Sequence, residues 1–180
     1  MLSSIVGIQR QPEPSKALEV PTFRQMLPQL AVELRRARRF ERPLAVVVLS
    51  PELETLSERS TTRIKGSARP ANWNLTQYLL LGSFLRNATR EIDVITAVPE
   101  SLLYASLLPE TTREGAMGAI ARLRQGFLEC GGVGLRSGIA EFPLDGFTIE
   151  DLYDSAFLHW KAARPTHSLG ATRQGDRVHG

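Results

Sequence analysis

The sequence has a single cysteine, Cys130, in 180 residues. One thiol cannot form an internal disulfide and cannot supply the clustered sulfur ligands of a structural zinc site. The three histidines, His159, His167 and His179, lack the short spacing that is typical of a metal site. We therefore expect a protein of a reducing compartment, with no cofactor and no bound metal ion.

Long hydrophobic runs are missing as well. No apolar stretch approaches the roughly 18 residues that a membrane-spanning helix needs, and residues 1–16 lack the basic stretch and apolar core of a signal peptide. The charge is nearly balanced, with 22 Lys and Arg against 19 Asp and Glu, so a net charge of +3 requires no polyanion as a partner. These absences predict a cytoplasmic protein without a membrane span and without nucleic acid as a ligand.

The composition that remains is that of an ordinary globular domain. Hydrophobic residues make up 42% and charged residues 23% of the chain, and 180 residues suit a single core. Prolines among polar residues at the start, and the lack of any apolar period near the end, predict disordered segments at 1–21 and 165–180. The folded domain is then expected at 22–164.

Apolar spacing and turn residues predict helices alternating with strands. Helices are predicted from Thr22, or from Pro28 if the proline begins the helix, to about Phe40, and then at about 74–89, 112–130 and 149–163. Strands are predicted at about 44–49, 92–98, 102–108 and 133–142, with a loop or frayed helix at 54–71. The second and third strands form a hairpin. This order predicts an α/β (α+β) fold, a mixed central sheet with helices packed on both faces.

Three segments of the chain resemble the GGDEF domain of diguanylate cyclases, the fold that makes cyclic di-GMP. SGIAEFPLDGFTIEDLYDSAFLHWKAAR, residues 137–164, resembles the closing strand, the Pro-x-Asp-Gly turn and the last helix of the family. LRRARRFERPLAVVVL resembles its opening helix and first strand, and LLPETTREGAMGAIARLR the segment after its signature hairpin. The resemblance covers roughly Phe23 to Pro165 and implies a GGDEF-like sheet.

The departures from the family pattern concern the catalytic residues. In active members, two glycines at the hairpin tip admit the nucleotide phosphates, and the acidic residues that follow help to hold the metal ion. This chain has Pro99–Leu103 there, or Glu100–Tyr104 if the alignment shifts by one residue. Residues 49–51, Leu-Ser-Pro, stand where the resemblance implies a metal-binding aspartate, and 74–75, Asn-Leu, where the family usually has Gly-Asp. The resemblance thus implies an inactive domain, not an enzyme, because phosphoryl transfer needs carboxylates to fix magnesium.

The resemblance also implies a ligand site. Many family members carry an inhibitory site for the product, an Arg-x-x-Asp motif before the hairpin joined by an arginine of the following helix. Arg90, Asp93 and Arg122 stand at these positions. The arginine fork suits the acceptors of guanine, and an aspartate accepts from the guanine amide and amine. An arginine and an aspartate three apart also occur as a plain surface ion pair, worth under about 1 kcal/mol.

Our hypothesis is that Arg90, Asp93 and Arg122 bind cyclic di-GMP, making the domain a receptor that regulates a partner protein, not yet identified, for example by bridging two copies of the domain as a homodimer. The alternative is a ligand-independent interaction module that uses a surface formed by Pro99, Leu102 and Leu103. An enzymatic interpretation requires an unusual metal site built from Glu52 and Glu100.

Overall fold

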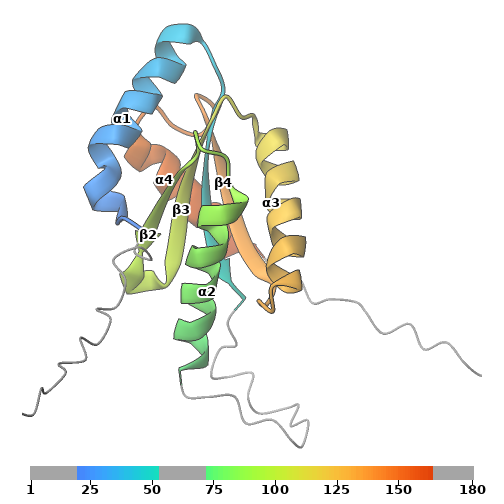
Figure 1. The fold of residues 1–180 in the computed structure, drawn as a ribbon. Helices are drawn as coiled ribbons and strands as arrows, with labels where there is room; N and C mark the ends of the chain where they lie inside the picture. The colour runs from blue at the N-terminus through green and yellow to red at the C-terminus, as the bar shows by residue number, and fades with distance from the viewer. Residues whose placement is uncertain (1–19, 53–71, 164–180) are drawn as a thin grey trace, which may run out of the picture.

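The computed structural model describes residues 20–52 and 72–163, which form helices around one central sheet (Figure 1). In chain order the elements are α1 (Phe23–Phe40), β1 (Leu44–Pro51), α2 (Trp73–Ala88), β2 (Val94–Val98), the short 3-10 turn η3 (Pro99–Ser101), β3 (Leu103–Pro109), α3 (Arg113–Glu129), β4 (Leu135–Phe142) and α4 (Ile149–Ala162). None of the helices in this described part of the chain is long and apolar enough to cross a membrane.

The predicted order of helices and strands is confirmed, with small shifts at the element ends. Most of the segments predicted as disordered, 1–21 and 165–180, and the predicted loop or frayed helix at 54–71, lie outside the described residues. At the first boundary, however, Pro21 belongs to the fold, because its carbonyl oxygen accepts a hydrogen bond of 2.8 Å from the N–H of Ala97.

The sheet has the strand order β2-β3-β1-β4, and the predicted α+β class with helices on both faces is confirmed. All three pairings between these strands are antiparallel. The mixed strand direction that we expected is limited to one parallel bridge between Thr22 and Ala97. The reason is that α2 and α3 each connect two strands that run in the same direction but have another strand between them, the split β-α-β arrangement.

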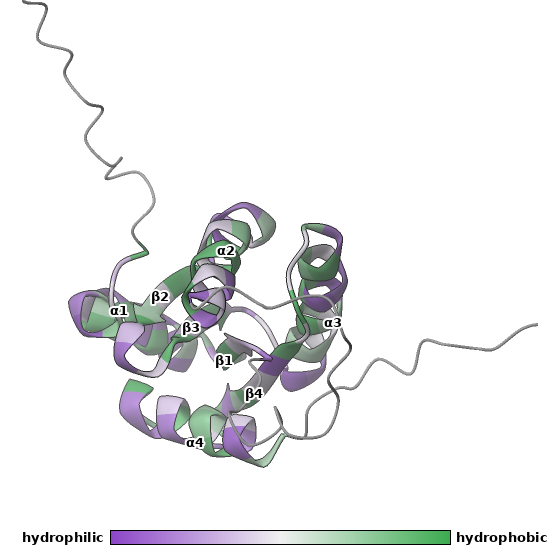
Figure 2. Cartoon of the chain, turned by 90° about the horizontal axis from the view of Figure 1, so that it is seen from below, coloured by the Kyte–Doolittle hydropathy of each residue, from purple (hydrophilic) through white to green (hydrophobic). Residues whose placement is uncertain are grey.

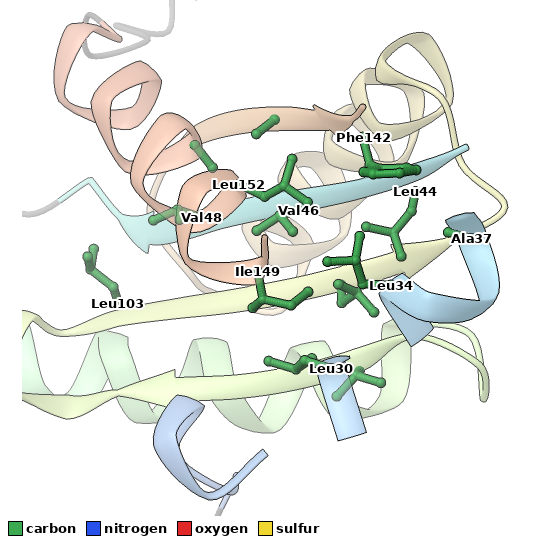
Figure 3. Close-up of a cluster of buried hydrophobic side chains, with 14 residues drawn as sticks. Leu30, Leu34, Ala37, Leu44, Val46, Val48, Leu103, Phe142, Ile149 and Leu152 are labelled. Carbon is green, nitrogen blue, oxygen red and sulfur yellow. The ribbon is translucent and has the colours of Figure 1, made fainter. Parts of the chain in front are cut away.

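β1 carries the two halves of the hydrophobic core. All eight of its residues are buried, and successive side chains point to opposite faces of the sheet. Leu44, Val46 and Val48 pack with α1 and α4 (Figure 3), whereas the residues between them pack with α2 and α3. Figure 2 shows the same division, with α2 and α3 on one side of the sheet and α1 and α4 on the other.

α1 begins at Phe23, so the alternative start at Pro28 is wrong. Thr22 and Gln25 form a capping box, in which the Thr22 hydroxyl accepts from the Gln25 N–H and the Gln25 side chain accepts from the Thr22 N–H at 2.8 Å. Pro28 therefore lies inside the helix, where proline costs about 3 kcal/mol. Burial of Leu30, Leu34 and Ala37 against the sheet offsets this cost.

The outer edge of β4 is bonded to side chains of the flanking helices. Arg124 of α3 donates from Nε to the carbonyl oxygen of Leu135 at 3.1 Å. Arg113 of α3 donates to the carbonyl oxygen of Ile139 at 3.4 Å, and Nδ1 of His159 of α4 lies 2.6 Å from the same oxygen. Helices from both faces of the sheet are thus tied to this edge.

α4 lies directly on β4 through a glycine. A Cβ atom added at Gly138 would stand 2.0 Å from the carbonyl oxygen of Ala156 and 2.2 Å from the backbone nitrogen of Trp160. Such distances leave no room for any side chain, so only glycine allows the two backbones to approach this closely.

Candidate functional site

A cavity of about 480 Å³ lies between α2 and α3, above the sheet. Arg90, Asp93 and Arg122 all line it, although they come from the turn after α2, the residue before β2 and the middle of α3. The interior is mostly apolar and is formed by Val47, Leu49, Phe84, Leu108, Ile120 and Leu123. The structure therefore brings the three residues selected from the sequence to one concave surface. Their binding of a ligand stays a prediction.

The turn between α2 and β2 fixes the orientation of Asp93. The backbone N–H of Arg90 donates to Oδ2 of Asp93 at 2.9 Å, and the N–H of Asp93 donates back to the carbonyl oxygen of Arg90 at 3.0 Å. No ion pair forms between these two side chains. Within residues 20–52 and 72–163, the guanidinium groups of Arg90 and Arg122 have no hydrogen-bond or ion-pair partner, so both are available to an anion.

Two buried oxygen atoms at the cavity lack a hydrogen-bond partner among the described residues. They are Oδ1 of Asp93 and Oγ of Ser106. Ser106 lies in the middle of β3, is 3% exposed and lines the same cavity. Buried polar groups in folded proteins are nearly always hydrogen-bonded, so each such atom calls for an explanation. Sequence analysis did not select Ser106, and its only signal was a hydroxyl inside an otherwise apolar strand.

A second hollow, of about 620 Å³, lies on the other side of Asp93, between α1 and β2. Its charged side chains are largely paired with one another. Arg42 binds Glu110 and Arg36 binds Glu33, the latter at 2.9 Å. These pairs leave little free charge for a ligand, so the cavity between α2 and α3 is the stronger candidate.

The hairpin between β2 and β3 is the segment where the resemblance places the catalytic signature of the family. Pro99, Glu100 and Ser101 form the turn η3, and Leu102 adopts the left-handed conformation with φ of 53°. Leu103 is 1% exposed and packs in the core on the α1 and α4 face. The predicted docking surface of Pro99, Leu102 and Leu103 is therefore wrong for Leu103, because pairing with Val98 turns its side chain inward.

The end of β1 is occupied by a contact with α4. Ser50 is 4% exposed, and its Oγ accepts a hydrogen bond of 3.0 Å from Nε1 of Trp160. The guanidinium of Arg136 stacks over the Trp160 ring at 4.5 Å and donates to the Trp160 carbonyl oxygen at 2.7 Å. The Ser50 hydroxyl carries no negative charge and is already bonded to the indole, so it is a weaker magnesium ligand than a carboxylate at the same position. Among the residues that the structure describes, no group of three or more His, Cys, Asp or Glu side chains could hold a metal ion.

Two stacked tyrosines fill the space between α2 and β3 toward the hairpin. The rings of Tyr78 and Tyr104 lie 4.6 Å apart, and the Tyr104 hydroxyl donates to the Tyr78 carbonyl oxygen at 3.1 Å. Burial raises the pKa of Tyr104 far above its ordinary value and raises the pKa of Tyr78 as well. Both phenols are therefore neutral structural groups.

No protein-family model and no curated protein matches the sequence. Solved structures of GGDEF domains do match. The GGDEF domain of PA1120 (TpbB or YfiN) from Pseudomonas aeruginosa is similar with a TM-score of 0.61 and 20% identity, over 83% of this chain and 90% of that one. The active GGEEF domain of a diguanylate cyclase from Vibrio cholerae matches with a TM-score of 0.60 and 16% identity, over 80% and 91%.

A third match is the GGDEF domain of DgcB from Caulobacter crescentus, solved in complex with c-di-GMP. It has a TM-score of 0.61 and 11% identity, over 86% of this chain and 91% of that one. At these identities the similarity shows the fold, which is that of GGDEF domains.

Proposed function

We propose that this domain is a catalytically inactive GGDEF-like receptor that binds cyclic di-GMP through Arg90, Asp93 and Arg122 and thereby regulates a partner protein. The observation that carries the proposal is the single cavity that Arg90, Asp93 and Arg122 all line. The complex of the similarly folded DgcB domain with c-di-GMP supports this choice of ligand.

The chemistry of the three side chains suits this dinucleotide. The guanidinium groups of Arg90 and Arg122, which have no partner in the described part of the chain, can form charge-assisted bonds with the two phosphates or fork onto the acceptors of a guanine. The carboxylate of Asp93 is the acceptor proposed for guanine N–H groups, and its Oδ2 is held by the backbone N–H of Arg90. The carboxylate is thus pre-oriented, which lowers the entropy cost of binding.

Two regions support the proposed lack of cyclase activity. They are the end of β1 and the hairpin tip, where the resemblance implies metal binding and phosphate binding. Ser50 is bonded to Trp160, and the turn η3 carries no glycine at which a phosphate could approach the backbone. Incubation of the protein with GTP and either magnesium or manganese is expected to give no cyclic di-GMP. Sustained product formation would refute the inactive assignment while leaving the binding site open to test.

Binding is tested by isothermal titration calorimetry with cyclic di-GMP. The unmodified protein is expected to bind at about 10 µM or tighter, and Arg90→Ala and Arg122→Ala each to weaken binding about 10- to 100-fold, the value of one charge-assisted hydrogen bond. Arg35→Ala is the matched control, since Arg35 is exposed on α1, on the opposite side of the sheet. No heat from the unmodified protein at tens of micromolar, about the upper limit for a useful receptor, would end the proposal.

Regulation is tested with the double variant Arg90→Ala, Arg122→Ala in an assay of the partner, once a partner has been isolated with the ligand-loaded protein. Loss of partner control in the double variant is expected, because the ligand can act only through its differential affinity for two states. Control that persists without the arginines would favour the ligand-independent interaction module.

A further inference from the structure

The hollow between α1 and β2 follows an outer edge of the sheet. β2 is the strand at that end of the sheet, and Figure 1 shows α1 alongside it. The helix lines the hollow from Met26 to Phe40, a rise of about 21 Å. About six residues of extended chain span the same length. The hollow is therefore a groove that is long enough for a short strand.

The backbone of β2 is unpaired at one position in this groove. The N–H of Ala97 points away from β3 and donates to the carbonyl oxygen of Pro21 at 2.8 Å. Because the backbone groups of a strand alternate in direction, the N–H and the carbonyl oxygen of Ile95 also point away from β3. Among the residues that the structure describes, neither of these two groups has a hydrogen-bond partner. Ile95 also lines the groove, so a ligand there can reach its backbone.

The identity of residue 21 explains why the pairing that begins at Ala97 stops before Ile95. Thr22 forms a single parallel bridge with Ala97. One step further along the edge, a parallel ladder would need the N–H of residue 21 to bond the carbonyl oxygen of Ile95. Residue 21 is proline, which has no N–H. The ladder that starts at Thr22 therefore ends there.

The side chains of the groove combine apolar surface with an excess of negative charge. Phe40 and Ile92, both exposed, line it from the end of α1 and from the turn before β2. Exposed apolar side chains that gather at one groove are typical of an interaction site. The two ion pairs of the groove are neutral, which leaves the carboxylates of Glu91 and Asp93. Glu91 is exposed and has no partner among residues 20–52 and 72–163.

We propose that this groove binds a short extended segment of a partner protein, which adds to the sheet beside β2. The backbone of the segment accepts from the N–H of Ile95 and donates to its carbonyl oxygen. Successive side chains of a strand point to opposite faces, so every second one faces α1 and is apolar. The side chains between them include lysine or arginine, which the net negative charge attracts. In this mode of recognition the main-chain bonds give affinity and alternate side chains give specificity.

A second copy of the same domain fits the groove less well than a basic segment does. Pairing between the β2 edges of two copies would be symmetric, so the same surface would meet itself. The unpaired carboxylate of Glu91 and that of Asp93 would then lie near their own counterparts. Like charges brought together at an interface oppose association. Charge thus favours a partner segment that is basic.

The open edge is tested first in the free protein, by amide hydrogen exchange followed by NMR. The amide of Ile95 is expected to exchange at least about tenfold faster than that of Ala97, because only the latter is hydrogen-bonded. Equal protection of the two amides would show that another segment or a second copy already covers this edge, and the proposal would fail.

Binding is then tested with a peptide of defined chemistry. The probe is the seven-residue peptide TVRVKVT with blocked ends, and its matched control is TVEVEVT, which has the same β propensity and the opposite charge. We expect TVRVKVT to bind with a dissociation constant of about 0.1–1 mM, in keeping with the few bonds that one free residue of the edge can form. It should also slow hydrogen exchange at Ile95, whereas TVEVEVT should do neither.

Two variants of the groove and one control identify the site. Glu91→Lys is expected to weaken binding of TVRVKVT about fivefold, the value of one exposed ion pair. Ile92→Ser is expected to weaken it about tenfold through lost apolar contact. Leu158→Ser is the control, because Leu158 is similarly exposed, at 63% against 54% for Ile92, and lies on α4 outside the groove.

Three results of the peptide experiment would overturn the inference. The first is no binding of TVRVKVT at millimolar concentration. The second is equal binding of the acidic peptide, and the third is binding that leaves the exchange of Ile95 unchanged. All measurements are made without cyclic di-GMP. Their failure would therefore leave the proposed receptor function standing, and failure of the receptor function would leave the groove open to this test.

Discussion

Replacement of Gly138 by alanine tests how closely α4 is held against the sheet. The added Cβ would lie 2.0 Å from the Ala156 carbonyl oxygen, whereas real contacts of this kind are essentially never shorter than 3.0 Å. Both partners are backbone atoms, and Gly138 is paired with Val48 of the central strand. Neither side can yield by rotating a side chain, so α4 must move outward by about 1 Å.

The cost can be worked from the contacts that this movement disturbs. Overpacking of a well-packed core typically costs about 1–3 kcal/mol. The shift would also stretch the bonds from Trp160 to Ser50 and from Arg136 to the Trp160 carbonyl, now 3.0 and 2.7 Å long, each worth about 1 kcal/mol. We therefore expect Gly138→Ala to lower the free energy of unfolding by about 3 kcal/mol, a large part of the 5–15 kcal/mol of a typical domain.

The measurement is urea denaturation, in which the change appears as a lower midpoint at an unchanged m-value. Gly118→Ala is the control, because Gly118 lies within α3 and its added Cβ would meet only Nη1 of Arg122, at 3.9 Å. Alanine there should raise stability by about 0.5–1 kcal/mol. If Gly138→Ala stayed within about 0.5 kcal/mol of the unmodified protein, the tight packing of α4 on β4 would be refuted.

Two further predictions concern titrating groups. The pKa of Asp151 is lowered by its hydrogen bond with the Thr148 hydroxyl and by the backbone N–H groups of Thr148 and Phe147. The contribution of Asp151 to stability should be complete above the ordinary pKa of a carboxyl group, and it should be lost as the pH falls through the lower pKa of the folded state. Melting temperatures of Asp151→Asn and of the unmodified protein should therefore converge in acid. A difference that stays constant with pH would contradict this. Tyr104→Phe should lower the free energy of unfolding in urea denaturation by about 1 kcal/mol, because it removes the buried hydrogen bond to the Tyr78 carbonyl oxygen. Since burial raises the pKa of Tyr104, this phenol should not ionise below about pH 11 in the folded protein. A spectroscopic titration should therefore count the same number of ionising tyrosines in Tyr104→Phe as in the unmodified protein. A count lower by one in the variant would contradict the buried position of Tyr104.

Much of the fold follows from local sequence signals. Thr22, Thr112 and Thr148 each accept a hydrogen bond at a helix start, and the continuous apolar run of β1 is typical of a strand covered on both faces. The strand directions did not follow from these signals. The strand directions depend on which strand lies between the two strands that α2 or α3 connects. That arrangement is decided by packing between residues far apart in the chain.

The candidate site was predictable only in part. Arg90, Asp93 and Arg122 were found through the spacing of a known family motif, and no local pattern would have joined them. Ser106 was not selected, because a single serine in an apolar strand gives no periodic signal. Such a hydroxyl is usually bonded to the nearby backbone, so the sequence alone gave no reason to expect that it lacks a partner. Leu103 was assigned to the surface because it stands where the resemblance places the catalytic face of the family. In the structure Leu102 completes the turn in the left-handed conformation, and Leu103 begins β3 with its side chain in the core.

The arginine and histidine contacts along β4 have a consequence for assembly. An extra strand from another molecule would need the carbonyl oxygens of Leu135 and Ile139, and these already accept hydrogen bonds from within the same chain. Docking there would require breaking those bonds before any intermolecular ladder could start, which is how many proteins avoid fibre growth. Sheet extension between molecules is thus disfavoured at the β4 end of the sheet.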